Sequence, residues 1–233
     1  MANAQEIPWA RIAVEGAAIV VSILLAFAID AWWEDRAERQ QERAVLVQIL
    51  RDLTVDADDM RPIVVRSEGI AGAMVWLHNN LERTDVPIDS MIHRISEIPS
   101  TYSYEAADAA YAGLKASGSL DLIEDPDLLG DLFFYFEDRQ AAMEQLNEWI
   151  LEGESRFWTR VAPYVRFGPA VTLVDRPPVT NLDLAGMRSD RNFQSEIVWN
   201  GGANESQARD GRAFLELNAD LARAVGDYLA SLN

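Results

Sequence analysis

The longest apolar stretch of the chain runs from Ile12 to Ile29 and contains Glu15 as its one ionisable residue. A charged string, Glu34 to Arg43, follows almost directly. An apolar helix of about 20 residues spans a bilayer core of roughly 30 Å. This pattern predicts a transmembrane anchor over residues 1–33, followed by a polar helix that leads away from the membrane.

Two other interpretations of this segment stay open, a cleaved signal peptide and a helix buried in a protein core. Ala26-Phe27-Ala28 could be a cleavage site, but a signal peptide needs a basic start, and Arg11 is the one basic side chain before the apolar run. A core helix normally shows a polar face, and residues 16–29 carry only Ser22 as a polar side chain. These observations favour the membrane span.

Several residues of the segment are suited to contacts in or beside a membrane. Arg11 and Glu15 share a helical face, which allows a local ion pair or, alternatively, a contact between Glu15 and another membrane subunit. Small residues every four positions would let a second helix approach closely. We expect this helix contact to be made by Arg11, Glu15, Ala18, Ser22, Ala26 and Asp30. We expect the aromatic anchors at the two interfaces to be Trp9, Trp32 and Trp33.

Helical spacing of apolar residues continues after the membrane segment. The polar string predicts a juxtamembrane stalk over residues 34–58, because it can continue the same helix. Asp58-Asp59 followed by Pro62 predicts a stop there and a second helix from about residue 61 to Glu82.

The remaining chain, residues 59–233, predicts an acidic helical bundle. Asp125 and Pro126 mark the start of a long helix, and Ser117-Gly118 marks the end of the preceding one. The segment near 167–187 is irregular or short strand, and Gly201-Gly202 separates a helix near 189–199 from the last one. The fold class is therefore all-α: an N-terminal transmembrane helix that continues into a stalk, then an antiparallel helical bundle.

Two motifs resemble an uncharacterised bacterial family of single-pass membrane proteins. The first comprises Glu15, the apolar run to Ile29, Asp30, Trp32-Trp33 and Glu34. The second comprises Tyr111, Leu114-Lys115, Ser117-Gly118, Leu120, Ile123, Asp125, Leu128 and Tyr135-Phe136, with Ala112-Gly113 in place of the family's acid-Thr pair. The resemblance implies a transmembrane helix, a helical domain outside the cytoplasm and no particular activity.

Composition excludes several functions. The net charge of −18 disfavours nucleic-acid binding, because such a surface repels phosphate backbones. The absence of cysteine excludes disulfides, thiolate metal sites and cysteine nucleophiles. Lys115 is the only lysine among 20 basic residues, which suggests a GC-rich bacterial genome.

No residue set specifies a reaction. His78 and His93 are the two histidines and lie in different predicted elements, so an ordinary surface position is favoured over a metal site. The acids from Asp121 to Asp127 lack the spacing of a calcium loop and are better explained by helix capping. The aromatic residues at 102–111 and 133–136 are interpreted as core rather than as a pocket lining. We expect no catalytic residue, cofactor or metal.

The expected function is an accessory or scaffold subunit that binds the lipid bilayer and other membrane proteins, or a second copy of itself, without catalysis. The alternative is a membrane-tethered, extracytoplasmic ligand-binding domain of the sensor type, and a tethered hydrolase is a third possibility. Arg36, Arg39 and Arg43 favour a cytoplasmic bundle, whereas the resemblance implies a periplasmic one. We place the chain in the bacterial inner membrane with the bundle in the periplasm.

Overall fold

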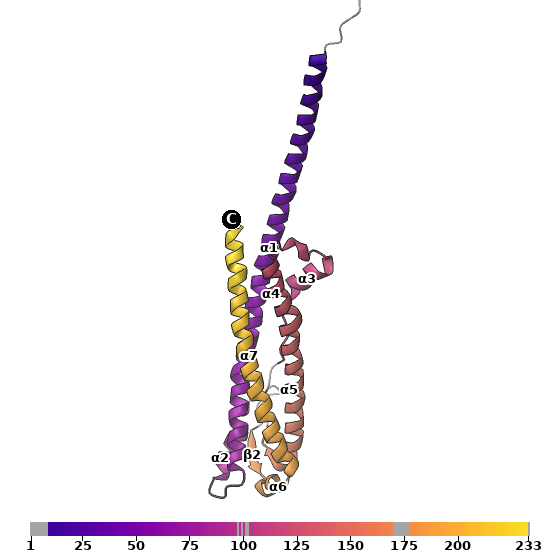
Figure 1. Ribbon diagram of the computed structural model, residues 1–233. Helices are drawn as coiled ribbons and strands as arrows, with labels where there is room; N and C mark the ends of the chain where they lie inside the picture. Colours follow the sequence, from indigo (N-terminus) through magenta and orange to yellow (C-terminus); the bar gives the residue numbers. More distant parts are fainter. Residues whose placement is uncertain (1–8, 97, 99, 101–102, 170–177, 233) are drawn as a thin grey trace, which may run out of the picture.

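A computed structural model describes residues 9–96, 98, 100, 103–169 and 178–232, and in the first helix it describes the side chains of residue 17 and of residue 20 onward. Three long helices lie side by side: α1 (Trp9–Asn80), α5 (Gln140–Val161) and α7 (Arg191–Ser231). Helix α7 is antiparallel to α1, since Tyr228 near its end meets Glu42 and Gln207 near its middle meets Ser67. The expected all-α fold is confirmed (Figure 1).

Helix α1 is one continuous helix, so the break expected at Asp58–Pro62 is wrong. Pro62 lies inside it and cannot donate a hydrogen bond to the carbonyl of Asp58. The helix continues because residues on both sides of the proline are buried in the bundle, among them Met60, Ile63 and Val64. The part of the expected stalk from Glu42 onward is also packed there, with Leu46 completely buried.

Helix α7 is likewise a single helix, so the separation expected at Gly201-Gly202 is wrong. A Cβ at Gly201 would lie 3.2 Å from the Cβ of Met74 on α1. The missing side chain therefore permits close packing of two helices and does not end one.

Shorter elements connect the long helices at both ends of the bundle. They are α2 (Ile88–Ser96), α3 (Ala109–Ser117), η1 (Leu120–Leu122), α4 (Pro126–Phe133), the π-helical turn η2 (Phe134–Arg139), η3 (Ala162–Tyr164), β1 (Val165–Phe167), β2 (Val179–Leu182) and α6 (Leu184–Ser189). The two strands pair antiparallel. Two predictions are confirmed: Asp125 caps α4 through the amides of Asp127 and Leu128, and Gly118 ends α3 with a φ of 70°.

The bundle interior contains two hydrophobic clusters. One surrounds Leu53, Tyr135 and Phe214, and the other surrounds Met74, Phe157 and Phe193. A buried polar layer lies at the level between them, where Ser67 Oγ donates to Gln207 Oε1 at 2.6 Å and Gln207 Nε2 donates to Asn147 Oδ1 at 3.2 Å. This layer joins all three long helices, and sliding one helix along another would leave these groups without partners.

Candidate functional site

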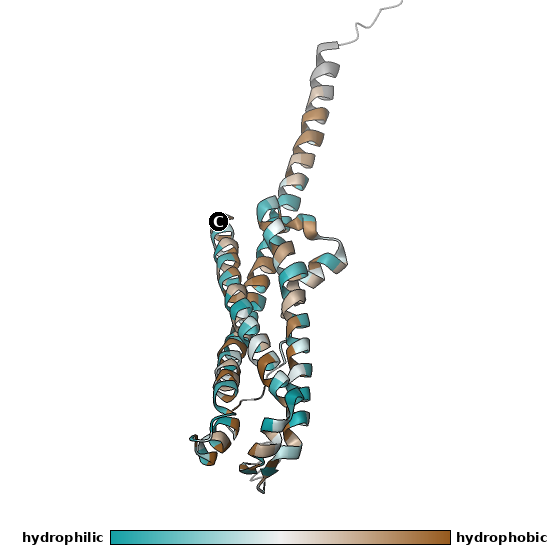
Figure 2. Ribbon diagram, turned by 60° about the horizontal axis from the view of Figure 1, so that its bottom comes forward, coloured by the Kyte–Doolittle hydropathy of each residue, from teal (hydrophilic) through white to brown (hydrophobic). Residues whose placement is uncertain are grey.

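The N-terminal part of α1 projects beyond the rest of the protein as a single helix (Figure 1). Every residue from Val20 to Glu34 is exposed, and α1 first becomes buried at Glu42. The apolar band on this projection is followed by polar residues where α1 reaches the bundle (Figure 2). Its large exposed apolar side chains are Val20, Val21, Ile23, Leu24, Leu25, Phe27, Ile29, Trp32 and Trp33.

The residues predicted to contact another membrane helix belong to this projection. Ser22, Ala26 and Asp30 are exposed on α1. The predicted anchors Trp32 and Trp33 are exposed too, and their rings pack edge to face with the ring centres 5.4 Å apart. At 100° per residue, Ser22, Ala26 and Asp30 fall within an arc of about 80° on α1, which Trp33 shares. The side chains of Trp9, Arg11, Glu15 and Ala18 are outside the described residues.

Among the described residues, no helix has an apolar stretch long enough to cross a membrane. Seven positions of the apolar run, 12–16, 18 and 19, have side chains outside that description.

A groove lies where the projection joins the bundle. It has a volume of about 320 Å³, and we name it the arginine groove; its lining residues are Trp32, Asp35, Arg36, Arg39, Gln40, Arg43 and Leu232. The Arg39 guanidinium pairs with Asp35 at 2.7 Å, and the Arg36 guanidinium lies 5.9 Å from the centre of the Trp32 ring. In the sequence these arginines give only an orientation signal, because Leu232 is distant in the chain.

Among the acids that the structure describes, Asp56 is the most completely buried. Its Oδ1 accepts hydrogen bonds from Tyr104 Oη at 3.1 Å and the amide of Ala107 at 2.8 Å. Its Oδ2 accepts from Tyr135 Oη at 2.8 Å and Gln140 Nε2 at 2.5 Å. Burial raises the pKa of the Asp56 carboxyl, while these donors lower it in part, and burial also raises the pKa of both tyrosines. Because both oxygens are engaged and the side chain is enclosed, Asp56 ties three segments together and does not present a reactive group.

Two further acids of α1 accept hydrogen bonds from the stretch 103–125, which also contains Tyr104 and Ala107 and which we call the crossing segment. Asp52 Oδ2 accepts from the amide of Ala110 at 2.8 Å. Glu42 Oε1 accepts from the amide of Glu124 at 3.2 Å and from Tyr228 Oη at 2.8 Å. Burial, and then the Glu42 carboxylate, raise the pKa of Tyr228 to about 12. This role cannot be predicted from the sequence, since the spacing of these acids along α1 forms no recognisable motif.

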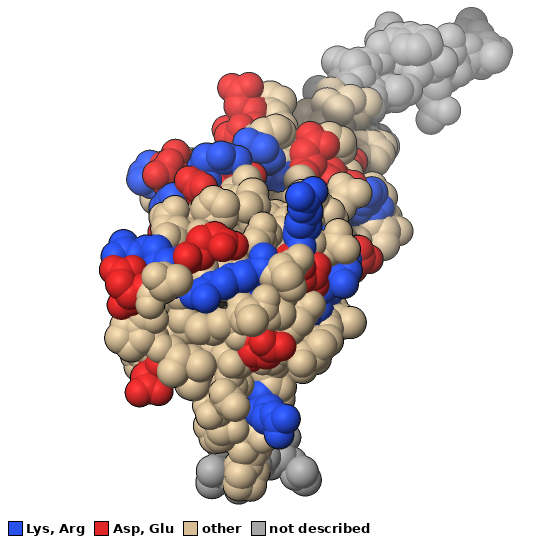
Figure 3. All heavy atoms as spheres, turned by 90° about the horizontal axis from the view of Figure 1, so that it is seen from below, with Lys and Arg blue, Asp and Glu red and all other residues tan. Residues whose placement is uncertain are grey.

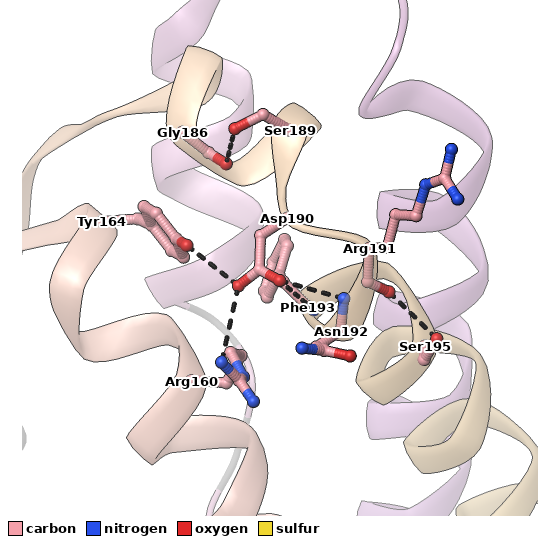
Figure 4. Close-up of polar contacts among 9 residues, drawn as sticks. All are labelled: Arg160, Tyr164, Gly186, Ser189, Asp190, Arg191, Asn192, Phe193 and Ser195. Atoms are coloured by element: carbon pink, nitrogen blue, oxygen red, sulfur yellow. Dashed lines mark hydrogen bonds and ion pairs between the residues drawn. The ribbon is translucent and has the colours of Figure 1, made fainter.

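The opposite end of the bundle contains a second polar cluster, centred on Asp190 (Figure 4). Asp190 caps α7 through the amides of Asn192 and Phe193, and it accepts a hydrogen bond from Tyr164 Oη at 2.9 Å. Desolvation raises the pKa of Asp190. The hydrogen bonds and the Arg160 guanidinium, 3.8 Å away, together lower this pKa by more, so that it lies below its usual value. All four partners are explained by capping and packing. Acidic and basic side chains are interspersed over the described part of this end (Figure 3).

The remaining residues singled out in the sequence, the two histidines and the aromatic residues, form no common site among the described residues. His78 and His93 are exposed on α1 and α2, and no group of three or more His, Asp or Glu suited to a metal occurs in the described part of the chain. Tyr104, Tyr111, Tyr135 and Phe136 are buried in the core, as expected, whereas Phe133 and Phe134 are exposed. Tyr102 is outside the described residues.

Comparisons with protein-family models, with curated proteins and with solved structures found no match to this chain. The resemblance to single-pass membrane proteins therefore stays a prediction.

Proposed function

We propose that this chain is a single-pass membrane protein of the bacterial inner membrane, in which the projecting part of α1 is the anchor. The observation that carries this proposal is the set of nine large apolar side chains on the projection, each at least 48% exposed. Moving one such side chain out of water is worth about 1.5–3 kcal/mol, so leaving all nine in water is unfavourable. A bilayer would cover them on every side of the helix at once.

The bundle is then a binding module held beside the membrane and acts as an accessory or scaffold subunit for other membrane proteins, or for a second copy, without catalysis. The arc of Ser22, Ala26 and Asp30 supports a helix partner in the membrane, because the small residues allow close approach and an acid such as Asp30 is costly in a membrane unless it is paired. The anchor would place the indole rings of Trp32 and Trp33 at one membrane interface.

Extraction of membranes with alkaline carbonate tests the anchor. Cells would produce the full chain and a variant with Leu24→Arg and Phe27→Arg, and the membrane-bound fraction would be measured after extraction. We expect the unaltered chain to stay in the membrane and the variant to be released, because arginine near the centre of a span costs about 2.5–3.5 kcal/mol.

A matched control changes exposed apolar residues of α1 within the bundle. Val55 and Val65 are 49% and 67% exposed, so Val55→Arg with Val65→Arg adds the same charge without touching the anchor. Release of the unaltered chain, or equal release of both variants, would contradict the anchor.

Crosslinking in native membranes, followed by mass spectrometry, tests the scaffold function, and protease accessibility in spheroplasts tests the periplasmic side. A chain that crosslinks to no protein and purifies from mild detergent as a lone monomer would contradict the scaffold.

The sensor-like alternative would place a ligand in the groove between α5 and α7, which has a volume of about 160 Å³ and is lined partly by Met143, Leu146 and Phe214. Ligand-dependent thermal stabilisation of the protein would favour this alternative.

A further inference from the structure

The arginine groove concentrates positive charge in an otherwise acidic protein. Arg36, Arg39 and Arg43 are three and four residues apart, so they fall within one narrow arc of α1. All three line the groove and are exposed. The chain as a whole carries a net charge of −18, so this local surface has the opposite sign to the rest.

The acids next to these arginines do not neutralise the groove. At 100° per residue, Glu34 and Glu38 lie on the far side of α1, and neither lines the groove. Glu42 is buried, and its Oε1 already accepts two hydrogen bonds. Asp35 is the one acid in the lining, so the groove holds three arginines against one aspartate.

The groove also has apolar walls next to the apolar band of α1. Trp32 belongs to that band, and Leu232, which follows α7, lines the groove as well. In a membrane-anchored chain, Trp32 would lie at the depth of the lipid headgroups. Arginine side chains at this depth extend toward the headgroups and bind phosphate oxygens through two parallel N–H donors.

We propose that the arginine groove binds the headgroup phosphate of an anionic phospholipid, with the acyl chains lying along the apolar band of α1. This inference rests on the proposed membrane anchor. A phospholipid accounts for both the guanidinium groups and the apolar walls, whereas a free phosphate ion would use only the former. An anionic lipid is preferred to phosphatidylcholine because the three arginines repel the choline cation.

The test uses the full chain in nanodiscs made from equal parts of phosphatidylcholine and phosphatidylglycerol. Native mass spectrometry then counts the lipids that remain bound when the protein is released. We expect phosphatidylglycerol to be retained in preference to phosphatidylcholine. The variant R36Q/R39Q/R43Q should lose this preference by about fivefold for each arginine removed.

The control variant R61Q/R209Q/R223Q makes the same change in charge at arginines that are 62%, 66% and 68% exposed on the bundle. It should retain phosphatidylglycerol as the unaltered chain does, and circular dichroism would establish that both variants are folded. Equal retention of the two lipids, or an equal loss in both variants, would overturn the lipid site. Displacement of the lipid by inorganic phosphate would assign the groove to a free anion instead.

Carbonate extraction separates failure of this inference from failure of the anchor. A chain that resists carbonate but shows no lipid preference keeps its anchor and loses the lipid site. A chain that carbonate releases loses both.

Discussion

The carboxylate of Asp52 on α1 accepts a hydrogen bond at 2.8 Å from the backbone amide of Ala110 in the first turn of α3. Asp108 holds the N-cap position of α3, but its side chain makes no capping hydrogen bond. The helix is therefore capped by a side chain from a different helix, which fixes the crossing segment against α1.

Replacing Asp52 with alanine should lower the free energy of unfolding by about 1–2 kcal/mol, the usual cost of losing a helix cap. Asp108→Ala is the matched control and should change it by less than about 0.5 kcal/mol. Denaturant unfolding of the full chain in detergent, followed by circular dichroism, measures both values. A larger effect at Asp108 would show that α3 is capped locally after all.

Asp56 should make stability depend on pH. Its pKa is raised in the folded state, so the folded protein binds the proton more tightly than the unfolded chain. This contribution to stability is fully present below the unfolded pKa and is lost as the pH rises through the folded pKa. The variant Asp56→Asn cannot titrate, and it should be destabilised by about 1–3 kcal/mol because one amide nitrogen would face hydrogen-bond donors.

The stability deficit of Asp56→Asn should consequently be larger near about pH 3.5 than near about pH 7. Urea unfolding of both proteins at the two pH values provides the comparison, and the exposed Asp59→Asn serves as the control. A deficit that grows with pH would mean that the Asp56 carboxyl is stabilised in its charged form.

Two glycines of α7 should respond to alanine with opposite signs. A Cβ at Gly211 would lie 2.7 Å from Val64 Cγ2, so Gly211→Ala should cost about 1–3 kcal/mol by overpacking. A Cβ at Gly226 meets nothing within 4 Å, so Gly226→Ala should stabilise the protein by about 0.5–1 kcal/mol. Melting temperatures of the two variants would show the contrast, and two shifts in the same direction would contradict the packing of α1 on α7.

Pro62→Ala should stabilise the bundle. Alanine supplies the amide that can donate to the carbonyl of Asp58. A proline inside a helix costs about 3 kcal/mol. This cost is offset in part because proline also restricts the unfolded chain and so lowers its entropy. We expect a net gain of about 2 kcal/mol in the free energy of unfolding. Pro126→Ala is the control, because Pro126 occupies the first turn of α4, where no amide partner is lost. A similar gain from both variants would point to a common unfolded-state effect.

The sequence alone determined those features that depend on near neighbours. The spacing of apolar residues determined that the chain is helical, and Asp125, Pro126 and Gly118 determined where individual helices begin or end, since a cap acts within one turn. The apolar run and the tryptophans determined the candidate anchor.

Only the tertiary structure decided how far each long helix extends and what the buried acids do. Pro62 and Gly201 are helix-breaking signals locally, yet burial of α1 against α7 outweighs them. Asp56 lies far along the chain from Tyr104, Tyr135 and Gln140, so no spacing in the sequence could show that these groups meet. A hydrogen bond between distant residues depends on the positions of whole helices, and those positions follow from packing over the entire core.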